Sequence, residues 1–165
     1  MGDGREEFEE RFDELFAQAC RLALRLLGDP DSAEDVAAEA LARTWLSWPG
    51  LRGIGYVDAW VLRVTTNLAL DVHRRRRRWS LGRPSVDHAD AVALHLALVA
   101  ALRSLPRRQR EVVVLRHLSD LSEEKVAGLL GISTGTVGAH LHRGLAGLRR
   151  HLGDQREELF LAIEN

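Results

Sequence analysis

Apolar residues recur every three or four positions along most of the chain, which is the period of an amphipathic helix. The stripe of a first helix consists of Phe8, Phe12, Leu15, Phe16, Ala19, Leu22, Ala23 and Leu26. Gly28–Asp29–Pro30 ends that helix, and Asp31 or Ser32 caps the next one. The inner face of this second helix consists of Val36, Ala37, Ala40, Leu41, Thr44 and Trp45. The pattern predicts an all-α protein.

The remaining helices divide into two small bundles. Pro49–Gly50 and Gly53–Ile54–Gly55 predict a loop, after which a third helix runs from about Val57 to Arg78. In the second half, one helix covers about 88–104 and Pro106 opens another that runs to about His117. We therefore expect a first domain at 5–79, a short linker at 80–87, a second domain at 88–152 and an acidic tail at 153–165.

The second bundle ends in a predicted helix-turn-helix. Ser122 caps a short helix whose apolar face is Val126, Leu129 and Leu130, and Gly131 leaves that helix in a left-handed conformation. Ser133 or Thr134 then caps a longer helix with apolar residues at Val137, Leu141, Leu145 and Leu148. The second helix of such a motif enters the major groove of DNA, so this pattern points to nucleic acid.

Charge is strongly segregated although the net charge is only −1. Residues 1–73 carry fourteen acidic and seven basic side chains, and five consecutive arginines, Arg74–Arg78, follow them. A run of positive charges binds a phosphate backbone well, whereas an acidic surface suits a basic protein partner. The alternative for the arginine run is a solvated helix end that matches the helix dipole.

Composition excludes several other classes. The single cysteine, Cys20, rules out an internal disulfide framework, and its place on an apolar helix face indicates a buried structural thiol. The sequence has no apolar run of about 20 residues and no basic leader at its start, so we expect a cytoplasmic protein without membrane association. No catalytic constellation, cofactor motif or small-molecule site is recognisable. His140 and His142 point to different sides of a helix, which disfavours a shared metal ion.

Three segments carry a family resemblance that spans about 8–152. LRSLPRRQREVVVLRHLSDLSEEKVAGLLGISTGTV resembles the region of extracytoplasmic-function (ECF) sigma-70-type sigma factors that reads the −35 promoter element. GDPDSAEDVAAEALARTWLSW is similar to their acidic helix that binds core RNA polymerase. AWVLRVTTNLALDVHRRRRR is similar to the segment that melts and reads the −10 element. The resemblance implies an alternative sigma factor that directs promoter-specific initiation, and it leaves open an anti-sigma factor as a further partner.

The resemblance also assigns residues to surfaces. It implies that polymerase contacts Glu34, Asp35 and Glu39. It places Asn67 in a loop that captures an unstacked −10 base, with phosphates held nearby by Arg63, Arg74, Arg75, Arg76, Arg77 and Arg78. The alternative for Asn67 is a residue that merely interrupts the third helix. The −35 surface would comprise Thr136, Ala139, His140, His142, Arg143 and Arg149, with Arg143 as the best guanine contact.

The sequence departs from the family pattern at four positions. Gly138, Ala139 and His140 stand where Lys or Arg, Ser and Arg are usual, and Ala38 replaces a usual Gln. The first three departures weaken the −35 surface, and Ala38 changes the acidic helix that is expected to bind polymerase. They keep two other hypotheses open: a stand-alone helix-turn-helix regulator, and a degenerate protein that binds polymerase or a sigma antagonist without reading promoters.

Overall fold

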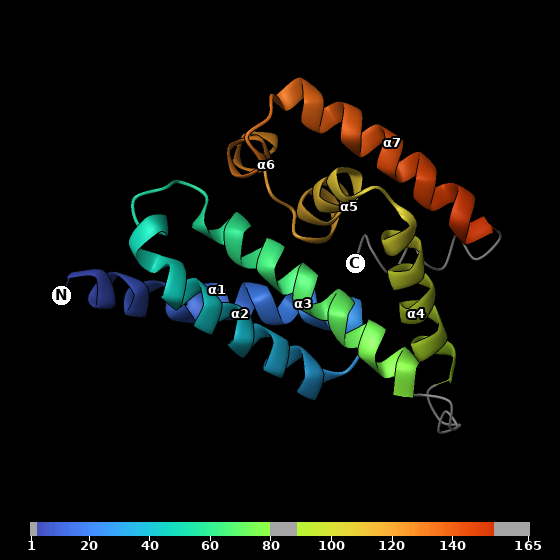
Figure 1. The fold of residues 1–165 in the computed structure, drawn as a ribbon, viewed down its shortest axis with the longest axis horizontal. Coiled ribbons are helices and arrows are strands. Elements are labelled where there is room, and N and C mark those ends of the chain that lie inside the picture. The colour runs from blue at the N-terminus through green and yellow to red at the C-terminus, as the bar shows by residue number, and fades with distance from the viewer. Residues whose placement is uncertain (1–2, 80–88, 154–165) are drawn as a thin grey trace.

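The computed structural model describes the backbone of residues 3–79 and 89–153, and the side chains of these ranges except at positions 3, 73, 76–79 and 89–94. Within the described part every regular element is a helix, and the helices form two groups, as Figure 1 shows. The first group comprises α1 (Asp3–Leu27), α2 (Pro30–Leu51) and α3 (Val57–Trp79). The second comprises α4 (Ala89–Ser104), α5 (Arg107–Val113), the π-helix η2 (Val114–Leu118), α6 (Glu123–Leu130) and α7 (Thr134–Leu152). The predicted all-α class and its two bundles are confirmed. The predicted linker and, beyond Gly153, the acidic tail lie outside the described residues.

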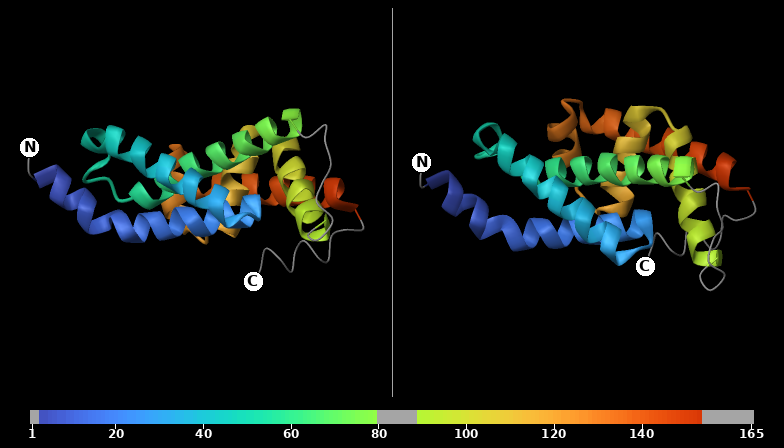
Figure 2. Two further views of the ribbon diagram at one scale, coloured as in Figure 1. Left: turned by 90° about the horizontal axis from the view of Figure 1, so that it is seen from below. Right: turned by 60° about the horizontal axis from the view of Figure 1, so that its bottom comes forward.

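The first group is a layer of three long helices, with α1 against both α2 and α3 (Figures 1 and 2). Its core contains Phe8, Leu15, Leu41, Trp48 and Val61. The predicted inner face of α2 was wrong at one position, because Trp45 is exposed and Trp48 is buried instead. Phe12, also predicted for the inner stripe of α1, is exposed in part, and its ring stacks on Phe16.

The ends of α2 also differ from the sequence prediction. Its N-cap is Asp29, whose carboxylate accepts from the Ser32 N–H, and Pro30 follows directly at the first helical position. Proline is compatible with that position because its fixed φ suits a helix and the N–H that it lacks would be unpaired there. At the other end the helix runs through Pro49 to Leu51, where a loop was predicted. Proline removes only one hydrogen bond so close to a helix end.

In the second group, α5 and α7 pack closely. A Cβ at Gly144 of α7 would lie 2.6 Å from Val113 Cγ2, and one at Gly147 would lie 2.6 Å from Leu105 Cδ2. At Gly144 the stiff Val113 side chain and the Gln109 carbonyl at 3.3 Å leave no room for a Cβ, so this position requires glycine for α5 and α7 to approach, whereas at Gly147 the Leu105 side chain, which precedes α5, would have to move. The helix predicted to reach His117 changes to a π-helix after Val113, with wider turns such as Ser119 N–H to Val114 C=O at 3.0 Å.

The two groups share a hydrophobic core. One cluster of buried residues includes Leu22, Leu26 and Leu62 from the first group, and Leu102, Leu118 and Leu121 from the second. Polar contacts join the groups as well, since the Arg25 guanidinium donates to the Leu118 carbonyl at 2.7 Å. The second group thus lies directly against α1 and α3 (Figure 1).

Candidate nucleic-acid and protein interfaces

Three caps build the helix-turn-helix. Ser122 Oγ accepts from the Lys125 N–H and begins α6, and Gly131 ends α6 with φ 64° and ψ 39°. Ser133 Oγ then accepts from the Thr136 N–H at 3.1 Å and begins α7. Each of these three predictions from the sequence is confirmed. Because the backbone polar groups of the turn are satisfied locally, the turn can hold α7 at a fixed angle to α6.

Helix α7 has one buried face and one open face. Val137 and Leu148 are buried, and Leu141 and Leu145 are partly buried. On the open side lie the exposed side chains of His142, Arg143 and Arg149. Arg143 Nε donates to the Ala139 carbonyl one turn earlier, at 3.2 Å, which holds the guanidinium along the helix. This surface offers hydrogen-bond donors to a groove or a phosphate backbone.

The other predicted −35 residues are less open. Thr136, Ala139 and His140 are only partly exposed, and Thr136 Oγ1 lies 2.8 Å from Ser133 Oγ within the cap. His140 Nδ1 is buried, and within the described part of the chain it has no hydrogen-bond partner. The structure therefore turns one edge of the His140 ring inward, away from the face that carries His142 and Arg143.

Helix α3 carries the predicted −10 residues. Asn67 is exposed in the middle of the helix, so the prediction that it lies in a loop was wrong, and it does not interrupt the helix either. Arg74 and Arg75 are exposed near the C-terminal end, with an Arg74 Nη atom 3.5 Å from Asp71 Oδ1. The helix includes Arg76–Arg78, whose side chains lie outside the described residues.

Arg63 differs from the rest of its set because it lies at the contact between the two groups. Its side chain is only 22% exposed, and Nε donates to Glu111 Oε1 of α5 at 3.0 Å. No sequence pattern indicates this pair, since the two residues are 48 positions apart in the chain.

The acidic residues of α2 are all exposed. Asp35 and Glu39 line a groove of about 430 Å³ that also contains Asp71 and Arg75 of α3. Glu39 forms an ion pair of 2.7 Å with Arg43. Glu34 affects Cys20 of α1. The pKa of the Cys20 thiol is raised, first by its burial and second by the negative charge of the Glu34 carboxylate. Cys20 is partly buried, so the prediction of a buried thiol holds only in part.

An apolar surface on α2 was missed by the sequence pattern. Leu46 is 81% exposed and Trp45 is 42% exposed. Both side chains line a groove of about 580 Å³ between the N-terminus of α1 and the end of α2. Large exposed apolar residues on one patch are typical of a protein-binding surface. Helical spacing alone could not reveal this exposed patch, because the position of Trp45 fits the period of the inner face of α2.

Comparisons with known proteins match the two groups of helices to two regions of one family. Residues 12–79 match the family described as Sigma-70 region 2, and residues 95–148 match Sigma-70, region 4. The RNA polymerase sigma-E factor of Streptomyces avermitilis is 38% identical over 156 residues, covering 88% of this chain and 85% of that protein. The chain belongs to the ECF family of sigma-70-type sigma factors. The ECF RNA polymerase sigma factor SigW of Bacillus subtilis is 27% identical over 154 residues, covering 81% and 82% of the two chains.

Two solved structures share the fold. CnrH, in complex with the cytosolic domain of CnrY, has a TM-score of 0.59 at 23% identity and covers 90% of this chain and 88% of its own. The sigma factor RpoE of Bartonella quintana, in complex with the anti-sigma factor NepR, has a TM-score of 0.56 at 21% identity, with coverage of 92% and 99%.

Membership of this family settles the general activity. The sigma factor is not an enzyme: it binds core RNA polymerase and promoter DNA and acts in transcription initiation. In the part of the chain that the structure describes, no helix combines the length and apolar character needed to cross a bilayer.

Proposed function

We propose that this sigma factor reads its promoters with two separate surfaces, a −10 surface along α3 and a −35 surface on α7. The −10 surface comprises Arg63, Asn67 and the arginines that end α3, with Asn67 as the residue that contacts an extruded base. The −35 surface comprises Thr136, Ala139, His140, His142, Arg143 and Arg149. The observation that carries this proposal is that exposed cationic or amide side chains occur on both helices, each within its own matched region.

We assign polymerase binding to the acidic side of α2. Glu34, Asp35 and Glu39 are exposed together there, and acidic side chains attract and orient a basic partner surface during association. The exposed Trp45 and Leu46 on the same helix extend this contact with apolar area.

Two further assignments rest on the family. We place the protein in the cytoplasm, where its polymerase and DNA are. We also propose an anti-sigma factor as a partner, because the CnrH and RpoE structures described above are complexes with a second protein, and the partner of RpoE is named as an anti-sigma factor.

In vitro transcription with core polymerase tests the proposal. Arg143→Ala should weaken promoter use by about 1–3 kcal/mol, the usual contribution of an arginine that reads guanine. Arg150→Ala is the matched control, because Arg150 is also exposed on α7 and its Nε also donates to the carbonyl one turn earlier. Asn67→Ala should slow strand opening without changing affinity for a −35 duplex.

The same assay separates the competing hypotheses. A stand-alone regulator would bind an operator tightly without polymerase and would be insensitive to Asn67→Ala. A degenerate binding protein would copurify with core enzyme yet initiate at no promoter, and the open, uncharged position Gly138 on the reader helix favours this second candidate. Equal transcription from Arg143→Ala and Arg150→Ala would contradict the proposed −35 surface.

A further inference from the structure

A groove in the first group has the size and composition of a small-molecule site. Its volume is about 580 Å³, and it lies between the first turn of α1 and the last turns of α2, at the end of the group where α1 begins (Figure 1). Pockets that bind small molecules usually measure about 300–1,000 Å³ and have mostly apolar walls with a few polar groups. We call it the aromatic groove, and its lining side chains are Trp45, Leu46, Trp48, Pro49, Arg5 and Arg52.

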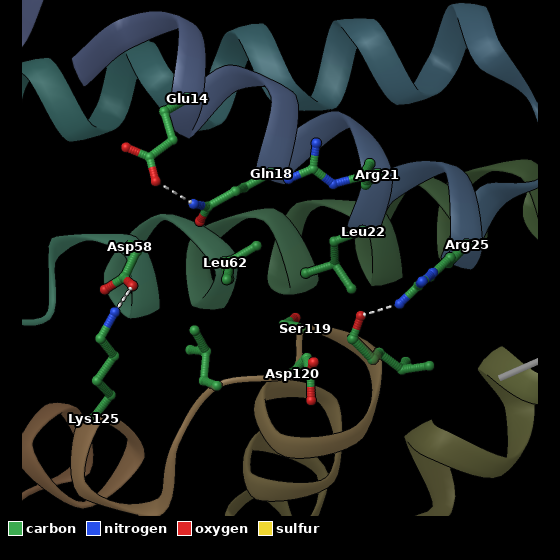
Figure 3. Close-up of a pocket in the computed structure, with 12 residues that line it drawn as sticks. Glu14, Gln18, Arg21, Leu22, Arg25, Asp58, Leu62, Ser119, Asp120 and Lys125 are labelled. Atoms are coloured by element: carbon green, nitrogen blue, oxygen red, sulfur yellow. Dashed lines mark hydrogen bonds and ion pairs between the residues drawn. The ribbon is translucent and has the colours of Figure 1, made fainter. Parts of the chain in front are cut away.

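The pocket between the two groups of helices has a different polar lining. Figure 3 shows it between α1, α3 and the segment that leads from η2 to α6. Several of its charged side chains already have partners in the chain, since Lys125 forms an ion pair with Asp58 and Arg25 donates to the Leu118 carbonyl. The aromatic groove, in contrast, contains two donors that no described residue satisfies.

Phe8 holds the aromatic walls of the groove in place. Its ring centroid lies 5.0 Å from that of Trp48, with the two rings nearly perpendicular, and 5.1 Å from that of Trp45. Phe8 and Trp48 are both buried, whereas Trp45 is partly exposed. Trp45 is therefore fixed from one side and open on the other, so a flat aromatic ligand can stack on it.

The first unsatisfied donor is the indole N–H of Trp48. Its Nε1 atom is buried and has no hydrogen-bond partner among the described residues. A buried tryptophan N–H usually finds an acceptor, because leaving a buried donor unpaired costs free energy. An acceptor supplied by a ligand in the groove would remove this cost.

The second donor is the guanidinium of Arg52. A Cβ built at Gly4 would lie 3.4 Å from Arg52 Nη1 and 4.0 Å from Trp48 Nε1, so both donors lie near the same point beside the first turn of α1. Arg52 is exposed, and in the described part of the chain its guanidinium has no acceptor. Arg5, the other cation of the groove, already forms an ion pair of 2.7 Å with Glu9. A carboxylate at this point can accept from both Arg52 and Trp48.

We propose that the aromatic groove binds an aromatic carboxylate, and that this ligand competes with core polymerase. The carboxylate accepts from Arg52 and from the Trp48 indole, and the aryl ring stacks on Trp45 beside Leu46. The ligand thereby covers the two exposed apolar residues of the proposed polymerase contact. The competition rests on the proposed function, whereas the binding site does not. Because coupling between two ligands is reciprocal, polymerase and carboxylate each lower the affinity for the other.

Isothermal titration calorimetry of the full chain with naphthoate tests the site. Naphthamide is the matched control ligand, because it keeps the ring system and replaces the carboxylate with a neutral amide. Naphthoate should bind at least ten times more tightly than naphthamide, since hydrogen bonds to a charged group are the stronger ones. In NMR spectra the indole N–H signal of Trp48 should move downfield as its proton enters a hydrogen bond.

Two variants test the two sides of the site. Arg52→Ala should weaken naphthoate binding about tenfold and leave naphthamide binding unchanged. Its control is Arg103→Ala, which makes the same change of charge at an exposed position of α4 and should alter neither affinity. Gly4→Leu places a side chain in the groove and should block both ligands although it removes no binding group. Wild-type affinity for naphthoate in either Arg52→Ala or Gly4→Leu would overturn the proposed site.

Titration of core polymerase into the sigma factor, with and without naphthoate, tests the competition. At about three times the wild-type Kd for naphthoate, polymerase binding should weaken about fourfold, as expected for exclusive binding of two ligands. In Arg52→Ala the same concentration should weaken it by less than about 1.5-fold. Arg52 lies outside the proposed polymerase surface, so this variant should bind polymerase normally without the ligand.

The outcomes separate the site from the proposed function. If naphthoate shows no saturable binding to the wild type, the site is wrong. If naphthoate binds through Arg52 and polymerase affinity stays the same, the competition is wrong. Trp45→Ala without ligand tests the polymerase contact by itself. If this variant binds polymerase like the wild type, the proposed apolar contact fails, while calorimetry in the absence of polymerase still decides whether the aromatic groove binds a carboxylate.

Discussion

At the scale of single residues, two glycines of α7 that look alike in the sequence have opposite surroundings. A Cβ at Gly144 would lie 2.6 Å from Val113 and 3.3 Å from the Gln109 carbonyl, so close packing requires glycine there. Apart from the adjacent residues and the helix's own backbone, no described heavy atom lies within 4 Å of a Cβ built at Gly138. Gly138 therefore has no packing role among the described residues, and it precedes the exposed His142 by one turn on the proposed reader face.

Gly138→Arg should strengthen binding to a −35 duplex. It restores a cation where the family usually has one, and it replaces a residue that lowers helix stability by roughly 1 kcal/mol relative to alanine. We expect the slope of log affinity against log salt to steepen by about one, which corresponds to one added phosphate contact. Fluorescence anisotropy at several salt concentrations measures this. Gly138→Ala is the control and should stabilise the fold without changing the slope; an equal slope for both variants would exclude a DNA contact at this position.

At the scale of elements, the sequence predicted the helices better than their ends. The caps of the helix-turn-helix were read correctly because Ser122, Gly131 and Ser133 each act within three residues of their own position. The start and end of α2 were misread, because Asp29 and Pro30 together begin a helix earlier than Asp31 would, and because Pro49 is tolerated in a last turn. The change from α5 to the π-helix at Val114 had no signal in the periodicity of apolar residues.

The cap of α6 should be sensitive to pH. Glu124 has a lowered pKa because its carboxylate accepts from its own backbone N–H and then from Ser122. A lowered pKa in the folded state stabilises the fold above the ordinary value of 4.5, and this contribution disappears as the pH falls through the lowered pKa. Ser122→Ala should lower stability by about 1 kcal/mol at pH 7 through loss of the cap and should raise the pKa of Glu124.

Urea unfolding at pH 7 and an NMR titration of the Glu124 carboxylate measure these two effects. Ser119→Ala is the control, because Ser119 ends η2 through its backbone N–H, which alanine keeps, and its side chain caps neither α6 nor α7. An unchanged pKa of Glu124 in Ser122→Ala would show that the backbone hydrogen bond alone lowers it.

At the scale of the whole molecule, the contact between the two groups is what the sequence could not predict. Helical periodicity shows which face of each helix is apolar, but not which helix covers it. Arg63 is the clearest case: its place in the chain predicts a DNA contact, and the fold pairs it with Glu111. Separate domains were predicted from composition around the linker, whereas the described residues form a core that runs through both groups.

That shared core makes a prediction about unfolding. All four tryptophans, Trp45, Trp48, Trp60 and Trp79, precede residue 80, so tryptophan fluorescence reports on the first group alone. Leu118 belongs to the second group, is 3% exposed and lies in the shared cluster. Leu118→Ala should lower the free energy of unfolding by about 3 kcal/mol, as other buried Leu→Ala changes do. If the groups unfold together, the Tm from tryptophan fluorescence should fall by roughly 5–10 °C, in step with the Tm from circular dichroism.

The comparison of the two signals decides between a shared core and two independent bundles. In the wild type, coincident transitions are expected, because opening the contact exposes apolar surface on both sides. In Leu118→Ala, a fall in the circular dichroism transition with an unmoved fluorescence transition would mean that the first group does not depend on the second. Lys125 of α6 forms an ion pair with Asp58 in the first turn of α3, so Lys125→Glu should partly uncouple the two transitions even without the core substitution. This ion pair and the shared core join the same two groups, so weakening either one should loosen the same contact.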